Sequence, residues 1–310
     1  MRERMPRGAL SEKEYQPRAA GRRLDELDPE CRADPSSRPE ERRHAGRTDR
    51  ARRDLYTPEA GDPAVSARDF RDLREFKSWN DAMVEKYDVE QFHNHPSSLV
   101  RYIERKRIRR IFALLAPRPG DRVLEIGCGA GHLLAQVPSA QGFGIDLAES
   151  LLAKAARRLN KRGTLVQGDA EHLPFRDGAW ERVYCSEVLE HLPSPAAALT
   201  EMHRIVAGGG VAVVSVPNER LINTLKAMLR TSGLYRVLLG SRSGEYQMPE
   251  RMDDEWHLHV FDLAGLLALI PPGLRVTHIE GVPFRWLPLR YVVRCESRIS
   301  PFPRPRASAT

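Results

Sequence analysis

The stretch VLEIGCGAG, Val123 to Gly131, decides the fold of this chain. Val123, Leu124 and Ile126 have the apolar character of a strand that is buried in a parallel sheet. The glycines that follow allow the backbone to turn sharply and let a ligand approach without meeting a Cβ atom. A helix that starts at such a turn directs its free amides toward the ligand. We therefore predict a nucleoside-binding turn between a strand and a helix.

The spacing of these glycines argues against a dinucleotide site. A dinucleotide turn follows the pattern G-x-G-x-x-G, but the third glycine here, Gly131, comes one residue early and His132 follows it. Glu125, two residues before Gly127, would repel a pyrophosphate group. A carboxylate there suits a cationic ligand instead, such as the ammonium group of a methionine moiety. An NAD-dependent oxidoreductase and a cofactor-binding module without turnover remain alternative hypotheses.

Beyond Asp121 the apolar patterns predict alternating strands and helices. We expect strands at residues 122–126, 142–146, 164–169, 181–186, 210–216, 274–281 and 290–297. We expect helices at residues 131–137, 149–160, 195–206 and 262–270. This order is typical of an α/β fold. It predicts a Rossmann-like, doubly wound, mostly parallel seven-stranded sheet with helices on both faces.

Two aspartates follow the next strands, and with them the chain resembles the class I S-adenosylmethionine-dependent methyltransferases. Asp146 ends the second predicted strand, where a carboxylate can accept both ribose hydroxyls. Asp169 ends the third, and the motifs VYCSEVLEHLPSP and GGGVAVVSVPN then follow in the family's order. The resemblance implies S-adenosyl-L-methionine as cofactor, with Asp169 accepting the adenine amino group. The implied cofactor-binding residues are Glu125, Gly127, Gly129, Gly131, Asp146, Asp169, Ala170 and Glu187.

Glu187, Glu190 and His191 form a candidate metal site. On a helix after the fourth strand, their spacing would place them on one face. The methyltransferases of quinone biosynthesis resemble the chain here, and a metal-assisted O-methylation would follow by analogy. The alternative is a helix start in which Glu187 lies near the cofactor and His191 makes structural hydrogen bonds.

His257 and His259 are the candidate catalytic residues. Alternating residues of a short extended segment point the same way, and histidine is suited to proton transfer at neutral pH. The alternative is a structural role, with Phe261 buried and Asp262 capping the next helix.

Residues 219–254 are too long for a plain connection, and we predict that they form a substrate lid that bends at Ser232-Gly233. Its apolar residues suit a small-molecule methyl acceptor of lipidic, aromatic or glycan-linked type. Residues 219–239 also carry basic side chains, which would permit peripheral membrane contact.

The ends of the chain differ in composition from its middle. We predict a disordered, Arg-rich tail at residues 1–66, pocket-closing helices at 67–116, the methyltransferase domain at 117–298, and a second tail at 299–310. The basic run from Arg105 to Arg110 is interpreted as a solvated helix face.

The charge and cysteine content bear on partners and location. The net charge of +7 permits RNA binding. An RNA methyltransferase is nonetheless disfavoured. The sequence has no recognisable RNA-binding module, and it lacks the Asn-Pro-Pro-Tyr motif that holds the amine of a flipped base in amino-methylating enzymes. Four scattered cysteines and the lack of a long apolar run predict a cytoplasmic protein.

Overall fold

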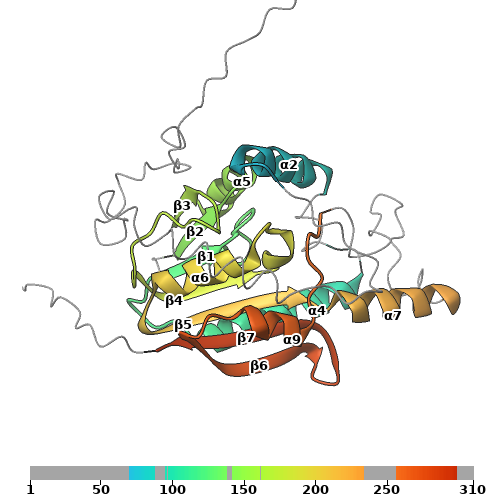
Figure 1. The fold of residues 1–310 in the computed structure, drawn as a ribbon. Coiled ribbons are helices and arrows are strands. Elements are labelled where there is room, and N and C mark those ends of the chain that lie inside the picture. The colour runs from blue at the N-terminus through green and yellow to red at the C-terminus, as the bar shows by residue number, and fades with distance from the viewer. Residues whose placement is uncertain are drawn as a thin grey trace, which may run out of the picture.

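The core of the protein is one seven-stranded sheet (Figure 1). A computed structural model describes residues 70–87, 95, 97–137, 142–160, 162–233 and 256–298. The strands are β1 (Val123–Ile126), β2 (Gly142–Asp146), β3 (Gly163–Gln167), β4 (Trp180–Ser186), β5 (Val206–Pro217), β6 (Leu274–Phe284) and β7 (Leu287–Ser297). Their order across the sheet is β3-β2-β1-β4-β5-β7-β6. The predicted α/β class and strand number are confirmed.

The direction of the strands determines where functional groups gather. Strands β1 to β5 are parallel, so their carboxyl ends meet at one edge of the sheet. Strand β7 is antiparallel to both β5 and β6, and Pro217 at the end of β5 lies opposite Arg290. The hairpin between β6 and β7 therefore extends past the same edge.

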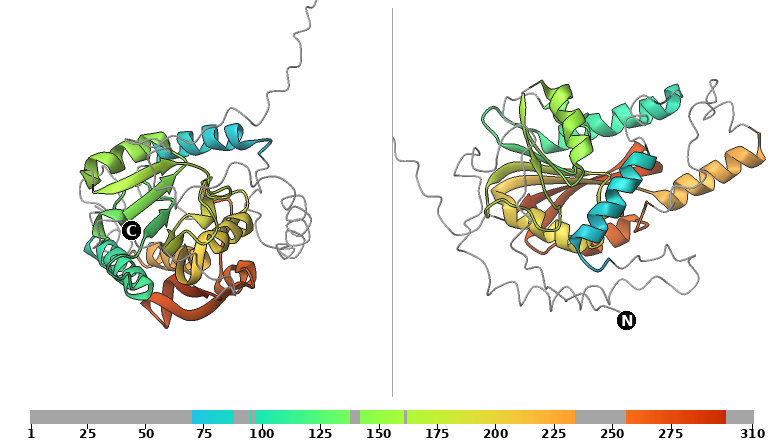
Figure 2. Two further views of the ribbon diagram at one scale, coloured as in Figure 1. Left: turned by 90° about the vertical axis from the view of Figure 1, so that its left-hand side faces the viewer. Right: turned by 90° about the horizontal axis from the view of Figure 1, so that it is seen from above.

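Helices cover both faces of the sheet, as predicted. They are α2 (Leu73–Lys86), α4 (Ser98–Leu115), α5 (Glu149–Leu159), α6 (Pro195–Ile205), α7 (Glu219–Thr231) and α9 (Leu263–Leu269). In the left view of Figure 2, α4 and α5 lie on one side of the sheet and α6 lies on the other. Asp72 and Asp262 cap α2 and α9, each accepting an amide N–H from the first helical turn. Among the described residues, no helix is long and apolar enough to span a membrane.

The side chains of β1 point alternately to the two faces of the sheet, and a separate part of the core lies on each face. Leu124 and Ile126 belong to a large buried cluster that includes residues of α2, α6 and α9. Val123 points to the other face, where it packs with Ile111 of α4 and Tyr184 of β4. Because the side-chain period of a strand is two, both faces of this strand are buried, as its apolar residues Val123, Leu124 and Ile126 predict, and Glu125 is buried with them.

Two predicted helices are shorter than expected. The segment 131–137 contains only the 3₁₀ helix η4 (Leu134–Gln136), because Gly127, Gly129 and Gly131 all have positive φ and hold the chain in a turn. After β4, only the 3₁₀ helix η5 (Leu189–His191) forms, since Pro193 follows closely. The predicted tails, 1–66 and 299–310, and residues 234–254 of the predicted lid lie outside the described residues.

Candidate functional site

The turn that follows β1 leaves open space beside Gly129. Gly127, Gly129 and Gly131 have φ values of 68°, 50° and 75°. A Cβ atom at Gly127 would lie 2.3 Å from Cγ2 of Val188, so packing requires glycine there. A Cβ at Gly129 would meet no atom within 4 Å. A ligand can therefore lie directly against the backbone at Gly129.

Asp146 is held by backbone amides at the carboxyl end of β2. Its two carboxylate oxygens accept the N–H groups of Gly129 at 2.7 Å and Ala148 at 2.9 Å. Burial raises the pKa of this carboxyl, and the amide donors oppose that shift. Each carboxylate oxygen can accept a second hydrogen bond, so the group remains able to receive a ribose hydroxyl.

Glu125 lies below the turn on the face that α4 covers. Tyr184 is its neighbour across the β1–β4 pairing, and the tyrosine hydroxyl donates to Oε2 of Glu125 at 3.0 Å. Burial raises the pKa of Glu125 to about 8, so the carboxyl is largely protonated at neutral pH. A bound cation would favour its ionised form.

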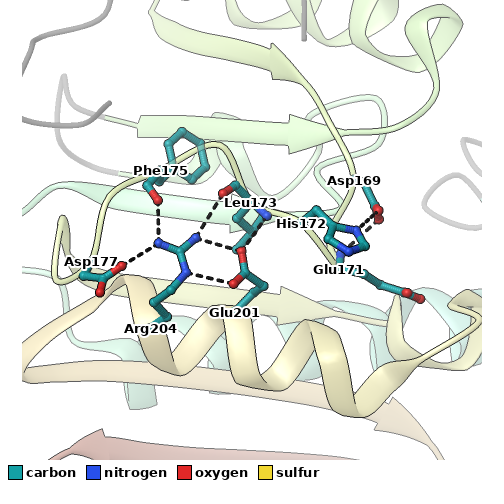
Figure 3. A network of polar contacts seen from close by, with 8 residues as sticks. All are labelled: Asp169, Glu171, His172, Leu173, Phe175, Asp177, Glu201 and Arg204. Carbon is teal, nitrogen blue, oxygen red and sulfur yellow. Dashed lines mark hydrogen bonds and ion pairs between the residues drawn. The ribbon is translucent and has the colours of Figure 1, made fainter. Parts of the chain in front are cut away.

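Asp169 follows β3, and its carboxylate is fixed by its own loop. Oδ1 accepts the amide of Glu171 at 2.9 Å, and Oδ2 lies 2.7 Å from Nδ1 of His172 (Figure 3). The hydrogen bond with Asp169 raises the pKa of His172. Ala170 packs against the main core cluster.

Helix α6 anchors this loop from below. Arg204 donates to the carbonyls of Leu173 at 3.0 Å and Phe175 at 2.7 Å, and it pairs with Asp177 and Glu201 (Figure 3). Glu201 also accepts the amide of Leu173 at 2.8 Å. The position of Asp169 thus depends on side chains about thirty residues away, as well as on its own loop.

Glu187 follows β4 in a strained backbone conformation, with φ of 55°. Its Oε2 lies 2.5 Å from Nε of Arg290, and its Oε1 accepts the hydroxyl of Ser215 at 3.0 Å. Arg107 of α4 is 4.0 Å from Oε1 and also pairs with the buried Glu104. Burial alone would lower the pKa of Arg107, but the surrounding carboxylates raise it. Glu187 is thus bracketed by two guanidinium groups.

The sequence predicted that Glu187, Glu190 and His191 lie on one helix face, but the structure has no such helix after β4. Because Glu187 precedes η5 and is not on a helix, its carboxylate is directed to Arg290. The structure instead brings together donor atoms of Glu190, His191 and His257, all within 4.8 Å of one another. Burial raises the pKa of Glu190 well above its usual range and lowers that of His191 well below. Oε2 of Glu190 has no hydrogen-bond partner among the described residues.

His257 and His259 have different surroundings. Nδ1 of His257 lies 2.9 Å from Oε1 of Glu219, which is fully buried at the start of α7. The N–H does not point at that oxygen, since neither atom has a hydrogen-bond partner among the described residues. His259 packs beside Phe261, and burial lowers its pKa. The two side chains thus have different neighbours, and the amides of Leu258 and His259 both donate to the carbonyl of Glu190, so the segment is not a regular extended strand.

Sequence reasoning missed three residues of this edge: Arg107, Glu219 and Arg290. Arg107 was assigned to a solvated helix face, yet it is 4% exposed. Its spacing of four from Ile103 and Ile111 places it on the apolar stripe of α4, and that was the available signal. Glu219 follows the carboxyl end of β5 directly, so its place at the edge could have been inferred from the strand pattern, whereas Arg290 reaches the edge only through the pairing of β5 with β7.

Comparison with known proteins shows the family to which the chain belongs. Residues 124–214 match a family model described as a methyltransferase domain. The chain is 30% identical over 188 residues to a ubiquinone biosynthesis O-methyltransferase from Burkholderia thailandensis, covering 59% of this chain and 76% of that one. A protein of the same name from Burkholderia pseudomallei is 37% identical over 126 residues, covering 39% and 54%.

Solved structures share the fold at low identity. A protein from Pyrococcus horikoshii superposes with a TM-score of 0.51 at 18% identity, covering 69% of this chain and 99% of that one. Magnesium protoporphyrin IX methyltransferase from Synechocystis, solved with bound SAH, gives 0.50 at 14%, covering 73% and 100%. At these identities the likeness concerns the fold alone.

Proposed function

The chain belongs to the class I S-adenosylmethionine-dependent methyltransferases, and we propose that it methylates a hydroxyl group of an apolar small molecule. S-adenosyl-L-methionine is the methyl donor, and a small molecule is the acceptor. The names of the Burkholderia relatives support transfer to oxygen and an aromatic acceptor with a lipid tail.

The residues of the first turn and of the strand ends fit the donor. Gly129 would contact it through the backbone, Asp146 would accept its ribose hydroxyls, and Asp169 with Ala170 would receive the adenine. Glu125 and Glu187 would face the methionine end; contact of the next residue, Val188, with the Gly127 position supports this role for Glu187. The bound donor supplies a methyl group that its sulfonium charge already activates. The protein must then hold the acceptor in line and remove its proton.

The pairing of His257 with Glu219 is the observation that carries the proposed proton transfer. Nδ1 of His257 lies 2.9 Å from Oε1 of Glu219, so a rotation of the ring that turns the Nδ1–H toward this oxygen would leave Nε2 free to accept the proton of an acceptor hydroxyl. Glu219 would act through His257 and is therefore a positioning residue. Among the two predicted catalytic histidines, this arrangement favours His257 over His259.

Helix α7 supports an apolar acceptor. It starts at Glu219, beside the proposed base, and continues with Leu221, Ile222 and Leu225. We propose that α7 forms the wall of a substrate lid, with the turn at Gly233 as one end of its hinge. The proposed membrane contact of residues 219–239 would begin on this helix.

Substitution of the proposed pair tests this assignment. We expect His257→Gln to lower kcat by ~10²–10⁴-fold, the usual contribution of a general base. We expect Glu219→Gln to lower it ~10–100-fold and to shift the pH profile of kcat, as loss of an orienting carboxylate does. Both variants should bind the donor with unchanged affinity in calorimetry. His259→Gln is the matched control, and an equal loss of kcat in that variant would overturn the assignment.

A divalent cation held by Glu190, His191 and His257 is a second candidate for activating the hydroxyl. The observation that favours it is the buried, unpartnered Oε2 of Glu190 close to both rings. A cation would favour the ionised carboxylate and polarise the acceptor oxygen. Treatment with EDTA separates the two candidates. Activity that is lost with EDTA and restored by Zn²⁺ or another transition-metal ion that accepts imidazole ligands would support the cation, whereas unchanged activity would support His257 as base.

A screen of acceptors tests the proposed substrate class. Purified full-length protein would be incubated with methyl-labelled donor and hydroxylated aromatic lipids, simple phenols, lipid-linked glycans or RNA. We expect label in the hydroxylated aromatic lipids, detected by mass spectrometry. Label found in RNA alone would contradict the proposal and favour the alternative RNA methyltransferase.

A further inference from the structure

Four large apolar side chains are exposed where α4 meets the β6–β7 hairpin. Leu99 and Tyr102 lie in the first turns of α4, with 41% and 44% of their surface exposed. Phe284 and Trp286 lie at the hairpin tip, with 39% and 77% exposed. We call these four residues the hairpin patch. Exposed apolar side chains that gather on one surface, with polar residues around them, are a feature of interaction sites.

The hairpin patch is a structured surface. The rings of Phe284 and Trp286 stack with centroids 5.2 Å apart and planes 4° apart. Lys106 links the two elements, since its Nζ lies 4.4 Å from the centroid of Phe284 and 5.7 Å from that of Tyr102. These cation–π contacts hold the amine at the border of the patch.

The charges around the hairpin patch are basic. Arg105 is exposed on α4, and Arg285 is exposed between Phe284 and Trp286 in the sequence. Lys106 lies near the rings of Tyr102 and Phe284. Glu104, the acidic residue on this part of α4, is instead buried against Arg107. A partner that combines an apolar layer with negative charge would complement this surface.

The hairpin patch also borders the functional edge. Pro217 at the end of β5 pairs with Arg290, and Phe284 pairs with Leu287, so the tip extends beyond the carboxyl end of β5. Figure 1 shows the hairpin, the start of α4 and α7 at the same end of the sheet. Arg290, which contacts Glu187, is on the strand that starts at this tip.

We propose that the hairpin patch docks on the surface of an anionic phospholipid bilayer. Tryptophan and tyrosine favour the interface between headgroups and acyl chains, where their rings have both apolar and polar surroundings. Lysine and arginine beside them are attracted to anionic headgroups. A second copy of the chain is disfavoured as occupant, because a two-fold contact would bring Arg105, Lys106 and Arg285 toward their own counterparts.

Docking in this way would turn the functional edge toward the bilayer. An apolar acceptor could then pass from the membrane to the site without crossing bulk water. This consequence rests on the proposed function, whereas membrane docking itself does not. Vesicle binding and methyl transfer are therefore measured separately.

Vesicle binding by the full-length protein tests the proposal. We expect co-sedimentation with vesicles of phosphatidylcholine and phosphatidylglycerol, and much weaker binding to phosphatidylcholine alone. Trp286→Ser and Phe284→Ser should each weaken binding to anionic vesicles by about tenfold, since they remove interfacial aromatic surface. The matched control is Ile279→Ser, because Ile279 is 38% exposed on β6 outside the patch. Every variant keeps the Arg-rich residues 1–66, so differences between variants report on the patch.

Tryptophan fluorescence supplies a second measurement. Trp79 and Trp180 are buried, Trp256 is half-buried, and Trp286 is 77% exposed. We expect anionic vesicles to shift the emission to shorter wavelength, and we expect Trp286→Phe to lose this shift while it keeps vesicle binding. Vesicle binding that Trp286→Ser leaves unchanged would overturn the proposal. So would a dimer in sedimentation that Trp286→Ser dissociates, in a protein that does not bind vesicles.

Discussion

Around Asp146, carboxylates are held by backbone amides from nearby residues, whereas around Glu187 they are held by guanidinium groups from distant elements. Asp146 and Asp169 each accept an N–H from a residue two positions later. Glu187 and its neighbours meet Arg107 of α4 and Arg290 of β7 instead. We call the part of the edge around Asp146 and Asp169, which is proposed to bind the donor, the donor half, and the part around Glu187 and His257 the acceptor half. The carboxylates of the donor half are held by backbone amides, with Arg204 and Glu201 of α6 supporting the Asp169 loop, whereas the acceptor half is assembled from side chains of distant elements.

This difference predicts different responses to substitution. In the acceptor half, Glu104 and Glu187 pair with the buried guanidinium groups of Arg107 and Arg290, so deletion of one partner leaves a buried charge uncompensated. In the donor half, the backbone conformation holds the site, so the glycines matter most for stability and the carboxylates for affinity.

The largest expected effect is that of Arg107→Met. This change leaves Glu104 and Glu187 without their shared cation, and we expect a loss of about 3–5 kcal/mol in the free energy of unfolding. Urea unfolding measures it. Arg109→Met, at an exposed position of the same helix, should change stability by less than about 0.5 kcal/mol. Equal losses of stability in the two variants would contradict the conclusion that the buried pairs of Arg107 stabilise the acceptor half.

Gly127→Ala should lower the free energy of unfolding somewhat less than Arg107→Met does. The new Cβ would meet Val188 at 2.3 Å, and φ of 68° is strained for alanine, so we expect a loss of about 2–4 kcal/mol. Gly129→Ala meets open space and should lose only the strain energy, about 1–2 kcal/mol. Unfolding of both variants checks this order. Adding Val188→Ala should restore part of the stability of Gly127→Ala and none of that of Gly129→Ala.

Asp146→Ala should reduce affinity for S-adenosyl-L-methionine by about 1–3 kcal/mol, because a buried hydrogen-bonded carboxylate is removed. Calorimetry with the donor measures the loss. His259→Ala serves as a control outside the donor half and should bind normally. Unchanged affinity of Asp146→Ala would contradict the assignment of this carboxylate to the ribose.

His172 should give the smallest effect, and it depends on pH. Its pKa is raised in the folded protein by Asp169, so the pair stabilises fully below the unfolded value of 6.5 and is lost as pH rises through the folded value. We expect His172→Gln to cost up to about 1 kcal/mol near pH 6 and nearly nothing near pH 9, since the imidazole is largely exposed. A cost independent of pH would indicate a packing role instead.

The positions of the glycines and carboxylates of the donor half could be predicted from the sequence, because each lies at the end of a short apolar pattern. Gly127, Gly129, Asp146 and Asp169 each lie at or just after the end of a strand, and the resemblance of their order to the class I methyltransferases implies the donor. The helix predicted after Gly131 was wrong in extent, because positive φ angles keep the turn going where the apolar pattern suggests a helix.

The acceptor half could be predicted only in part. His257 was singled out by its residue type, but its partner Glu219 lies 38 residues earlier (257 − 219), and no local pattern indicates that the two side chains meet. Glu187 and Glu190 do not share a helix face, because Pro193 limits η5 to one turn, although the charge of Glu187 still raises the pKa of Glu190. Arg107 was assigned to solvent because five basic residues in a short run outweighed its position on the apolar stripe.

The sequence by itself determined the order of the motifs and the fold class, since both depend on short-range patterns of apolar residues, glycines and carboxylates. The resemblance of those motifs to the class I methyltransferases implied the methyl donor. Only the tertiary structure decided which charges neutralise one another at the carboxyl ends of β4 and β5, and which apolar residues stay exposed beside them. The physical reason is that Coulomb pairing and burial depend on distance in space. Strand β7 lies between β5 and β6 and runs antiparallel to β5, and this brings Arg290 and the hairpin patch to the functional edge. The residues next to them in the sequence do not indicate this position.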